Sequence, residues 1–189
     1  MKNQGPSQEQ LQSVLNLYTH GKLQQALSES SQMLERFPNS VVLHNISGAS
    51  NAALKRFDAA IDSYKQALRI KPDYAEVHNN MGSVMKDKGD LEQAIESYKQ
   101  ALRIKPDYAV AHNNMAKAMK DKGDLEEAIE SYKQALRIKP DYAEVHNNLG
   151  IALRDKGDLN EAIDSFKQAI RIKPDYAAAY YNMGVTLKD

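Results

Sequence analysis

Histidine is the residue whose spacing most suggests catalysis or metal binding, because it recurs at regular intervals. His44, His78, His112 and His146 follow one another with the same spacing each time. Histidines that bind one ion from a single helix lie about four residues apart, so these four do not form such a set. The chain also has no cysteine, which excludes thiolate zinc sites, thiol nucleophiles and disulfides. We therefore predict packing positions for the histidines, and neither a metal nor a cofactor.

Asparagines form a second repeated set, and their chemistry is hydrogen bonding to a peptide backbone. Asparagine is a mediocre helix former, so pairs in the middle of an expected helix need a reason. Each side-chain amide offers two donors and an acceptor, so a row of them could hold an extended peptide without reading its sequence. The alternative is that duplication copied a neutral residue. The candidate residues are Asn80, Asn114, Asn148, Asn182, Asn79, Asn113 and Asn147.

Charged residues are expected on the same helix face as the asparagines: Glu76, Lys86, Lys117, Lys120 and Arg154. The basic ones could pair with ligand carboxylates, or they could simply be solvated helix ends. Basic and acidic residues number 25 each, so the formal net charge is zero. A neutral chain has no overall field that attracts nucleic acid or anionic membrane, and we predict neither as a partner.

No catalytic constellation has support in the sequence. We find no Ser/His/Asp set, and no glycine-rich loop that could hold a phosphate. We therefore predict that the chain is not an enzyme.

The elements that position these residues are set by an internal repeat. Pro38, Pro72, Pro106, Pro140 and Pro174 are evenly spaced along the chain. The segments 72–105 and 106–139 are identical except at six positions. Self-similarity at a fixed period of about 20–50 residues is typical of solenoid proteins and other repeat arrays.

Within each repeat the apolar residues predict two helices joined by a tight turn. In the segment 72–105, Asp73 and Glu76 have the spacing of a capping box at the start of the first helix. Gly89 can adopt the left-handed conformation that ends it, and Asp90 can cap the second helix. Pro106 then prevents further helix.

The repeat resembles the tetratricopeptide repeat, whose pattern is Trp-x2-Leu-Gly-x2-Tyr, then Ala-x3-Phe, then Pro. The matching residues here are His78-x2-Met81-Gly82-x2-Met85, Ala94-x3-Tyr98 and Pro106. Histidine for tryptophan and methionine for tyrosine are departures at positions that need bulk. The resemblance implies an all-α fold, a right-handed superhelical solenoid of antiparallel helical hairpins with about five and a half repeats and eleven helices.

We predict a single array over residues 7–189, preceded by a disordered N-terminus at residues 1–6. The predicted repeats are 7–37, which is degenerate, then 38–71, 72–105, 106–139, 140–173 and a half repeat at 174–189.

The family resemblance implies a concave groove lined by the first helix of each repeat, in which a protein or peptide binds. Asn80, Asn114, Asn148 and Asn182 look like the asparagine ladder in the superhelix of O-linked N-acetylglucosamine transferases. We therefore expect an interaction scaffold. The polar N-terminus lacks the apolar core of a signal peptide, so we expect a cytoplasmic location.

Two further hypotheses stay open. The chain could be the substrate-recognition arm of a larger glycosyltransferase-type or sulfotransferase-type enzyme, whose catalytic domain follows residue 189. It could also self-associate, because Met183 and Leu187 of the half repeat are expected at an apolar edge that could bind a second copy.

Overall fold

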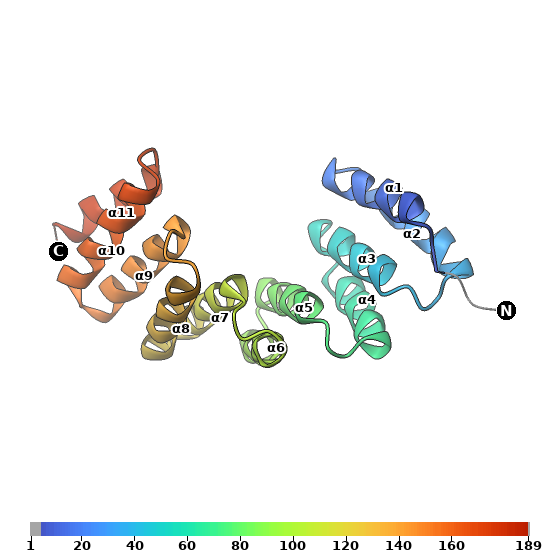
Figure 1. Cartoon of the computed structure of the whole chain (residues 1–189). Coiled ribbons are helices and arrows are strands. Elements are labelled where there is room, and N and C mark those ends of the chain that lie inside the picture. The colour runs from blue at the N-terminus through green and yellow to red at the C-terminus, as the bar shows by residue number, and fades with distance from the viewer. Residues whose placement is uncertain (1–4, 189) are drawn as a thin grey trace. The chain divides into compact units, whose positions relative to one another are not determined.

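The computed structural model describes residues 5–188, which form eleven helices and no strand (Figure 1). The predicted all-α fold of repeated helical hairpins is confirmed. The helices are α1 Gln8–Thr19, α2 Leu23–Arg36, α3 Val41–Ala53, α4 Phe57–Ile70, α5 Ala75–Lys88, α6 Leu91–Ile104, α7 Ala109–Lys122, α8 Leu125–Ile138, α9 Ala143–Lys156, α10 Leu159–Ile172 and α11 Ala177–Thr186. Of the predicted disordered segment, residues 1–4 lie outside the described part.

Two compact units share these helices. The N-terminal unit, Met1–Ile104, holds α1–α6, and the C-terminal unit, Lys105–Asp189, holds α7–α11. In both units an odd-numbered helix packs against the next even-numbered one to form a hairpin, and each hairpin contacts its neighbour in the same unit. None of the described helices is both long and apolar enough to cross a membrane.

Small residues let the two helices of a hairpin approach closely. A Cβ added at Gly82 would lie 2.9 Å from Cε1 of Tyr98, and one added at Gly150 would lie 2.6 Å from Cε1 of Phe166. Both rings are fully buried, at 0% exposure. The glycines therefore leave room for the aromatic side chain of the facing helix.

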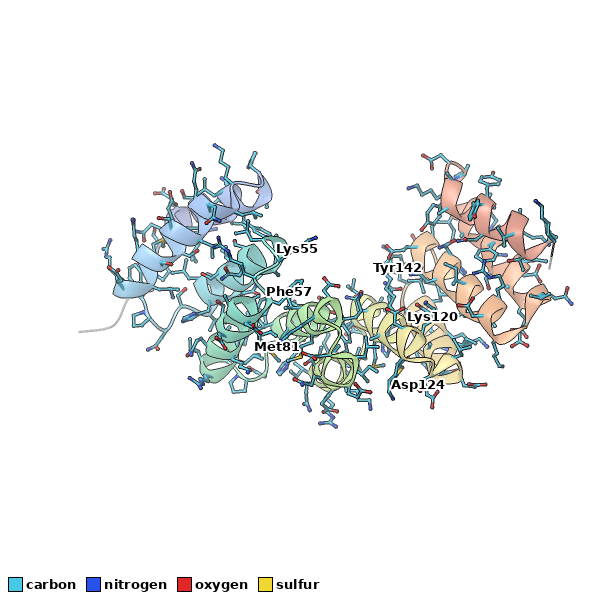
Figure 2. The ribbon with its side chains drawn as sticks, turned by 180° about the vertical axis from the view of Figure 1, so that it is seen from behind. Lys55, Phe57, Met81, Lys120, Asp124 and Tyr142 are labelled. Atoms are coloured by element: carbon cyan, nitrogen blue, oxygen red, sulfur yellow. The ribbon has the colours of Figure 1, made fainter. Side chains whose placement is uncertain are left out.

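The turns between paired helices use residues with positive φ. Gly89, Gly123 and Gly157 have φ of 95°, 98° and 98°, as the expected left-handed helix ends require. Lys55 stands at the same position between α3 and α4, with φ 58°, a conformation uncommon outside glycine. Figure 2 labels Lys55 at this turn.

The predicted capping box at Asp73 and Glu76 is wrong. Helix α5 begins at Ala75, its N-cap residue is Tyr74, and no side chain caps it. The proline–aspartate pair forms a turn before the helix, and the ammonium group of Lys71 lies 5.0 Å from the centre of the Tyr74 ring. Contact between a cation and an aromatic ring stabilises this turn before α5 by about 0.5–1 kcal/mol.

Candidate functional site

The odd-numbered helices form one layer in each unit. In the N-terminal unit α3 contacts both α1 and α5, and in the C-terminal unit α9 contacts both α7 and α11. No contact between even-numbered helices is found among the described residues of either unit. We call the odd-numbered helices the first helices; they carry all the predicted site residues.

The structure divides the paired asparagines into two classes by burial. Asn79, Asn113 and Asn147 are buried, with exposures of 5%, 2% and 4%. The residues that follow them, at positions 80, 114 and 148, are half-buried. The buried side chains have little surface left to offer a ligand.

Hydrogen bonds between neighbouring first helices explain this division. In the C-terminal unit, the amide of Asn148 donates to Oδ1 of Asn113 at 3.2 Å, and the amide of Asn182 donates to Oδ1 of Asn147 at 2.9 Å. In the N-terminal unit, the amide of Asn80 donates to Oδ1 of Asn45 at 3.4 Å. In the C-terminal unit, the half-buried asparagine of one helix thus satisfies the buried polar group of the preceding helix.

Two of the half-buried asparagines, Asn148 and Asn182, retain unused hydrogen-bonding groups. In the described part of the chain, no residue donates to the carbonyl oxygen of Asn148 or Asn182, and each amide has a second N–H. A backbone amide presents the complementary donor and acceptor. These side chains therefore have the chemistry to bind an extended main chain.

The basic candidates pair with carboxylates of the chain itself. Lys117 of α7 lies 2.7 Å from Glu144 of α9, so it joins two first helices. The other three pair with the next residue in sequence, as Lys86–Asp87 at 3.2 Å, Lys120–Asp121 at 3.2 Å and Arg154–Asp155 at 3.4 Å. Partly exposed pairs of this kind contribute about 0–1 kcal/mol, so a ligand carboxylate can replace the partner. Glu76, the acidic candidate, is half-buried on α5.

Each repeated histidine has a specific hydrogen-bond partner at the start of its repeat. Nε2 of His78 and of His146 lies 2.9 Å from the carbonyl oxygen of the proline that precedes the helix, and the same contact occurs at His44 and His112. Within residues 5–188 no group of three or more His, Cys, Asp or Glu side chains is placed to hold a metal ion.

A hydrogen bond between the two helices of a hairpin was not predicted from the repeat pattern. The hydroxyl of Tyr98 in α6 donates to Oγ of Ser83 in α5 at 3.2 Å. Burial raises the pKa of Tyr98 to about 12, so the phenol is a neutral donor at ordinary pH. In the last complete repeat the corresponding residues are Phe166 and Ile151, and neither has a polar group to satisfy.

The hairpins α3–α4 and α7–α8 break this relation. In the repeat 106–139, Lys117 stands at the position that Ser83 has in the preceding repeat. The buried hydroxyl of Tyr132 has no hydrogen-bond partner in the described chain. In the repeat 38–71, which contains Tyr64, Ala49 stands at the position of Ser83. A comparison of the positions equivalent to Ser83 and Tyr98 from one repeat to the next shows from the sequence which tyrosines lack a serine partner.

An open hollow of about 290 Å³ lies beside Tyr64 in the N-terminal unit. It is lined by Tyr18 of α1, by Ala49, Ala52 and Ala53 of α3, and by Tyr64 of α4. Helix α5 contributes the rest of the lining, which is Asn80, Ser83, Val84 and Asp87. Of these residues only Asn80 was predicted from the sequence to belong to a binding site.

The comparisons with known proteins agree with the hairpin architecture. Residues 52–89, 82–123, 117–157 and 151–189 match the family model described as TPR repeat. No curated protein matches the sequence.

Many solved structures have the same fold. A crystal structure of MamA is 25% identical, with a TM-score of 0.77, and covers 86% of this chain and 95% of that one. TTC0263 from Thermus thermophilus, described as a thermophilic TPR protein, is 23% identical, with a TM-score of 0.74 and coverages of 96% and 99%. YrrB is 19% identical, with a TM-score of 0.73 and coverages of 93% and 91%; it is described as a TPR protein with an unusual peptide-binding site.

Proposed function

Because this chain belongs to the tetratricopeptide-repeat family, we propose that it is an interaction scaffold whose first helices bind an extended peptide or an extended segment of a partner protein. The observation that carries the proposal is the unused amide groups of the half-buried Asn148 and Asn182. YrrB, which has the same fold, is described as having a peptide-binding site.

The proposed contacts are the half-buried asparagines, at positions 80, 114, 148 and 182. Asn79, Asn113 and Asn147 would act indirectly, because their buried side chains are bonded to the neighbouring asparagines. Glu76, Lys86, Lys117, Lys120 and Arg154 would tune the choice of ligand through charge. Neutral amides that hold the main chain of a ligand give affinity with little preference for its sequence. The charged positions, which vary between repeats, would supply that preference.

The test uses two matched variants of the C-terminal unit. Asn113→Ala removes the hydrogen bond between α7 and α9 but leaves Asn148 in place. Asn113→Ala with Asn148→Ala also lacks that bond, and lacks the proposed contact as well. Both variants remove the buried acceptor, Oδ1 of Asn113, and the amide that remains in the single variant belongs to the half-buried Asn148, which water can reach. Neither variant leaves a buried polar group without a partner, so both should keep the wild-type helical circular-dichroism spectrum.

The probe is a twelve-residue peptide selected by display on the wild-type chain. The single variant should bind it within about twofold of wild type, whereas the double variant should bind about tenfold more weakly, as loss of one or two hydrogen bonds implies. Equal affinity of the two variants would remove Asn148 from the site. Failure to select any peptide would count against the function itself.

Self-association is a second candidate, favoured by the surface of α11 and the residue that follows it. Tyr181 is 73% exposed and Leu187 is 64% exposed. Met183, expected at the same edge, instead packs partly buried against the core of the C-terminal unit. Light scattering across a concentration series tests this candidate, and a strictly monomeric chain at high concentration would exclude it.

The hypothesis of an enzyme's recognition arm makes a separate prediction. A catalytic domain should follow residue 189 in the full-length gene, and sequencing past that point decides it.

A further inference from the structure

We propose that the hollow beside Tyr64 binds the basic side chain, lysine or arginine, of a peptide held on the first helices. We call it the α3 hollow, formed by Tyr18, Ala49, Ala52, Ala53, Tyr64 and Asp87. The inference rests on the proposed function and adds a preference for the ligand that the asparagines do not supply.

The α3 hollow exists because one repeat has small residues where the following repeats have large ones. Ala52 stands at the position that holds Lys86 in the next repeat, and Ala53 at the position that holds Asp87. The loss of these two side chains opens the surface of α3. A volume of about 290 Å³ is far more than one water needs, so a ligand side chain fits.

Tyr64 places an unsatisfied polar group at the wall of this hollow. Ala49 replaces the serine that accepts the hydroxyl of Tyr98, and no described residue bonds the hydroxyl of Tyr64. The Tyr64 ring is only 2% exposed. Burial, with a smaller effect of nearby Tyr18, raises the pKa of Tyr64, so its hydroxyl stays neutral and can accept a hydrogen bond.

The charge of the lining selects a cation. Asp87 is its only charged residue, and the side chain of Asp87 is 58% exposed. Among the described residues its ion-pair partner is Lys86, at 3.2 Å, and a carboxylate can accept from a second cation. Ala49 and Ala52 offer apolar surface to the aliphatic stem that lysine and arginine bury. A ligand carboxylate would meet the repulsion of Asp87 instead.

The test measures binding of a single residue, N-acetyl-arginine methylamide, to the whole ¹⁵N-labelled chain by NMR. We expect saturable shifts of the Ala49, Ala52 and Val84 backbone amides, with a Kd on the order of 1 mM for so small a ligand. The citrulline analogue has the same shape without the charge, and should bind at least about tenfold more weakly. Asp87→Asn should weaken binding of the arginine probe about twofold to fivefold, as loss of a partly exposed ion pair implies.

A filling variant and its control complete the design. Ala52→Lys restores the side chain that the next repeat has at this position and should abolish the shifts. Gln32→Lys adds the same charge on the exposed face of α2 and should leave them unchanged. The amide spectrum itself reports whether each variant is folded, and Asp87→Asn keeps the test independent of the filling variant.

Several results would overturn the α3 hollow as a cation site. These are an absence of shifts at the named amides, equal binding of the citrulline analogue, stronger binding of N-acetyl-leucine methylamide, or unchanged binding by folded Ala52→Lys. The probe has no extended backbone and does not need the asparagines. Peptide binding without probe binding would therefore remove the hollow alone, and probe binding without peptide binding would remove the proposed function alone.

Discussion

Replacing Tyr132 by phenylalanine should stabilise the protein, although the substitution removes a polar group that most of the repeats share. The Tyr132 hydroxyl is buried, and no hydrogen-bond partner for it exists in the described chain. Burying a hydroxyl without a partner costs about 1–3 kcal/mol. Phe166 occupies the same position two helices later and is equally buried, so the ring alone fills the site.

Tyr98→Phe is the matched control, because the same chemical change there removes a hydrogen bond. The Tyr98 hydroxyl donates to Ser83 at 3.2 Å, and a bond of this kind contributes about 1 kcal/mol. Ser83 keeps its own bond to the carbonyl oxygen of Asn79 at 3.2 Å, so no further loss follows. We expect Tyr132→Phe to gain about 1 kcal/mol and Tyr98→Phe to lose about the same.

Urea unfolding followed by circular dichroism measures both changes, and thermal melting checks them. For a chain of this length each kcal/mol shifts the Tm by about 2–4 °C, so the two variants should move in opposite directions. A comparison of midpoints suffices, because repeat arrays need not unfold in a single cooperative step. Equal destabilisation by the two substitutions would refute the assignment of Tyr132 as unsatisfied.

Three further predictions address the packing and the titration. Gly150→Ala places a Cβ 2.6 Å from the ring of Phe166, so the clash should exceed the helix gain of about 1 kcal/mol, and urea unfolding should show a net loss of up to about 2 kcal/mol. His146→Phe keeps bulk but removes the 2.9 Å hydrogen bond to the carbonyl oxygen of Pro140, and unfolding in urea should show a loss of about 1 kcal/mol. Tyr98 has its pKa raised from 10.0 to about 12 by burial, so the stability from its neutral form is full below pH 10 and is lost as pH rises to 12. The urea midpoint of wild type should fall over that window, and that of Tyr98→Phe should fall less.

The helices and turns could be predicted because their signals repeat and are local. The evenly spaced prolines marked the boundaries, and Gly89 and Gly157 end their helices in the left-handed conformation as expected. The capping box at Asp73 failed because the aspartate belongs to the turn before the helix. Which residue becomes the N-cap depends on the backbone dihedral angles at the start of the helix. The spacing of residues alone does not specify those angles.

The site was harder to predict, because burial depends on the neighbouring repeat. Asn147 and Asn148 are adjacent and identical in type, yet one is buried against α11 and the other is half-buried. Helical periodicity placed both on the same side of α9. The contact between successive first helices then covers one of them, and that contact cannot be derived from a single repeat.

Nearly identical repeats also restrict where ligand preference can come from. A feature that recurs from repeat to repeat, such as the half-buried asparagine, treats each part of a bound chain alike. Preference for a particular side chain must arise where the repeats differ. In the described chain the small residues Ala49, Ala52 and Ala53 open a hollow at one repeat and leave the Tyr64 hydroxyl without the serine partner that Tyr98 has. The same substitutions that weaken the repeat pattern therefore create the surface that we propose to select a basic side chain in the N-terminal unit.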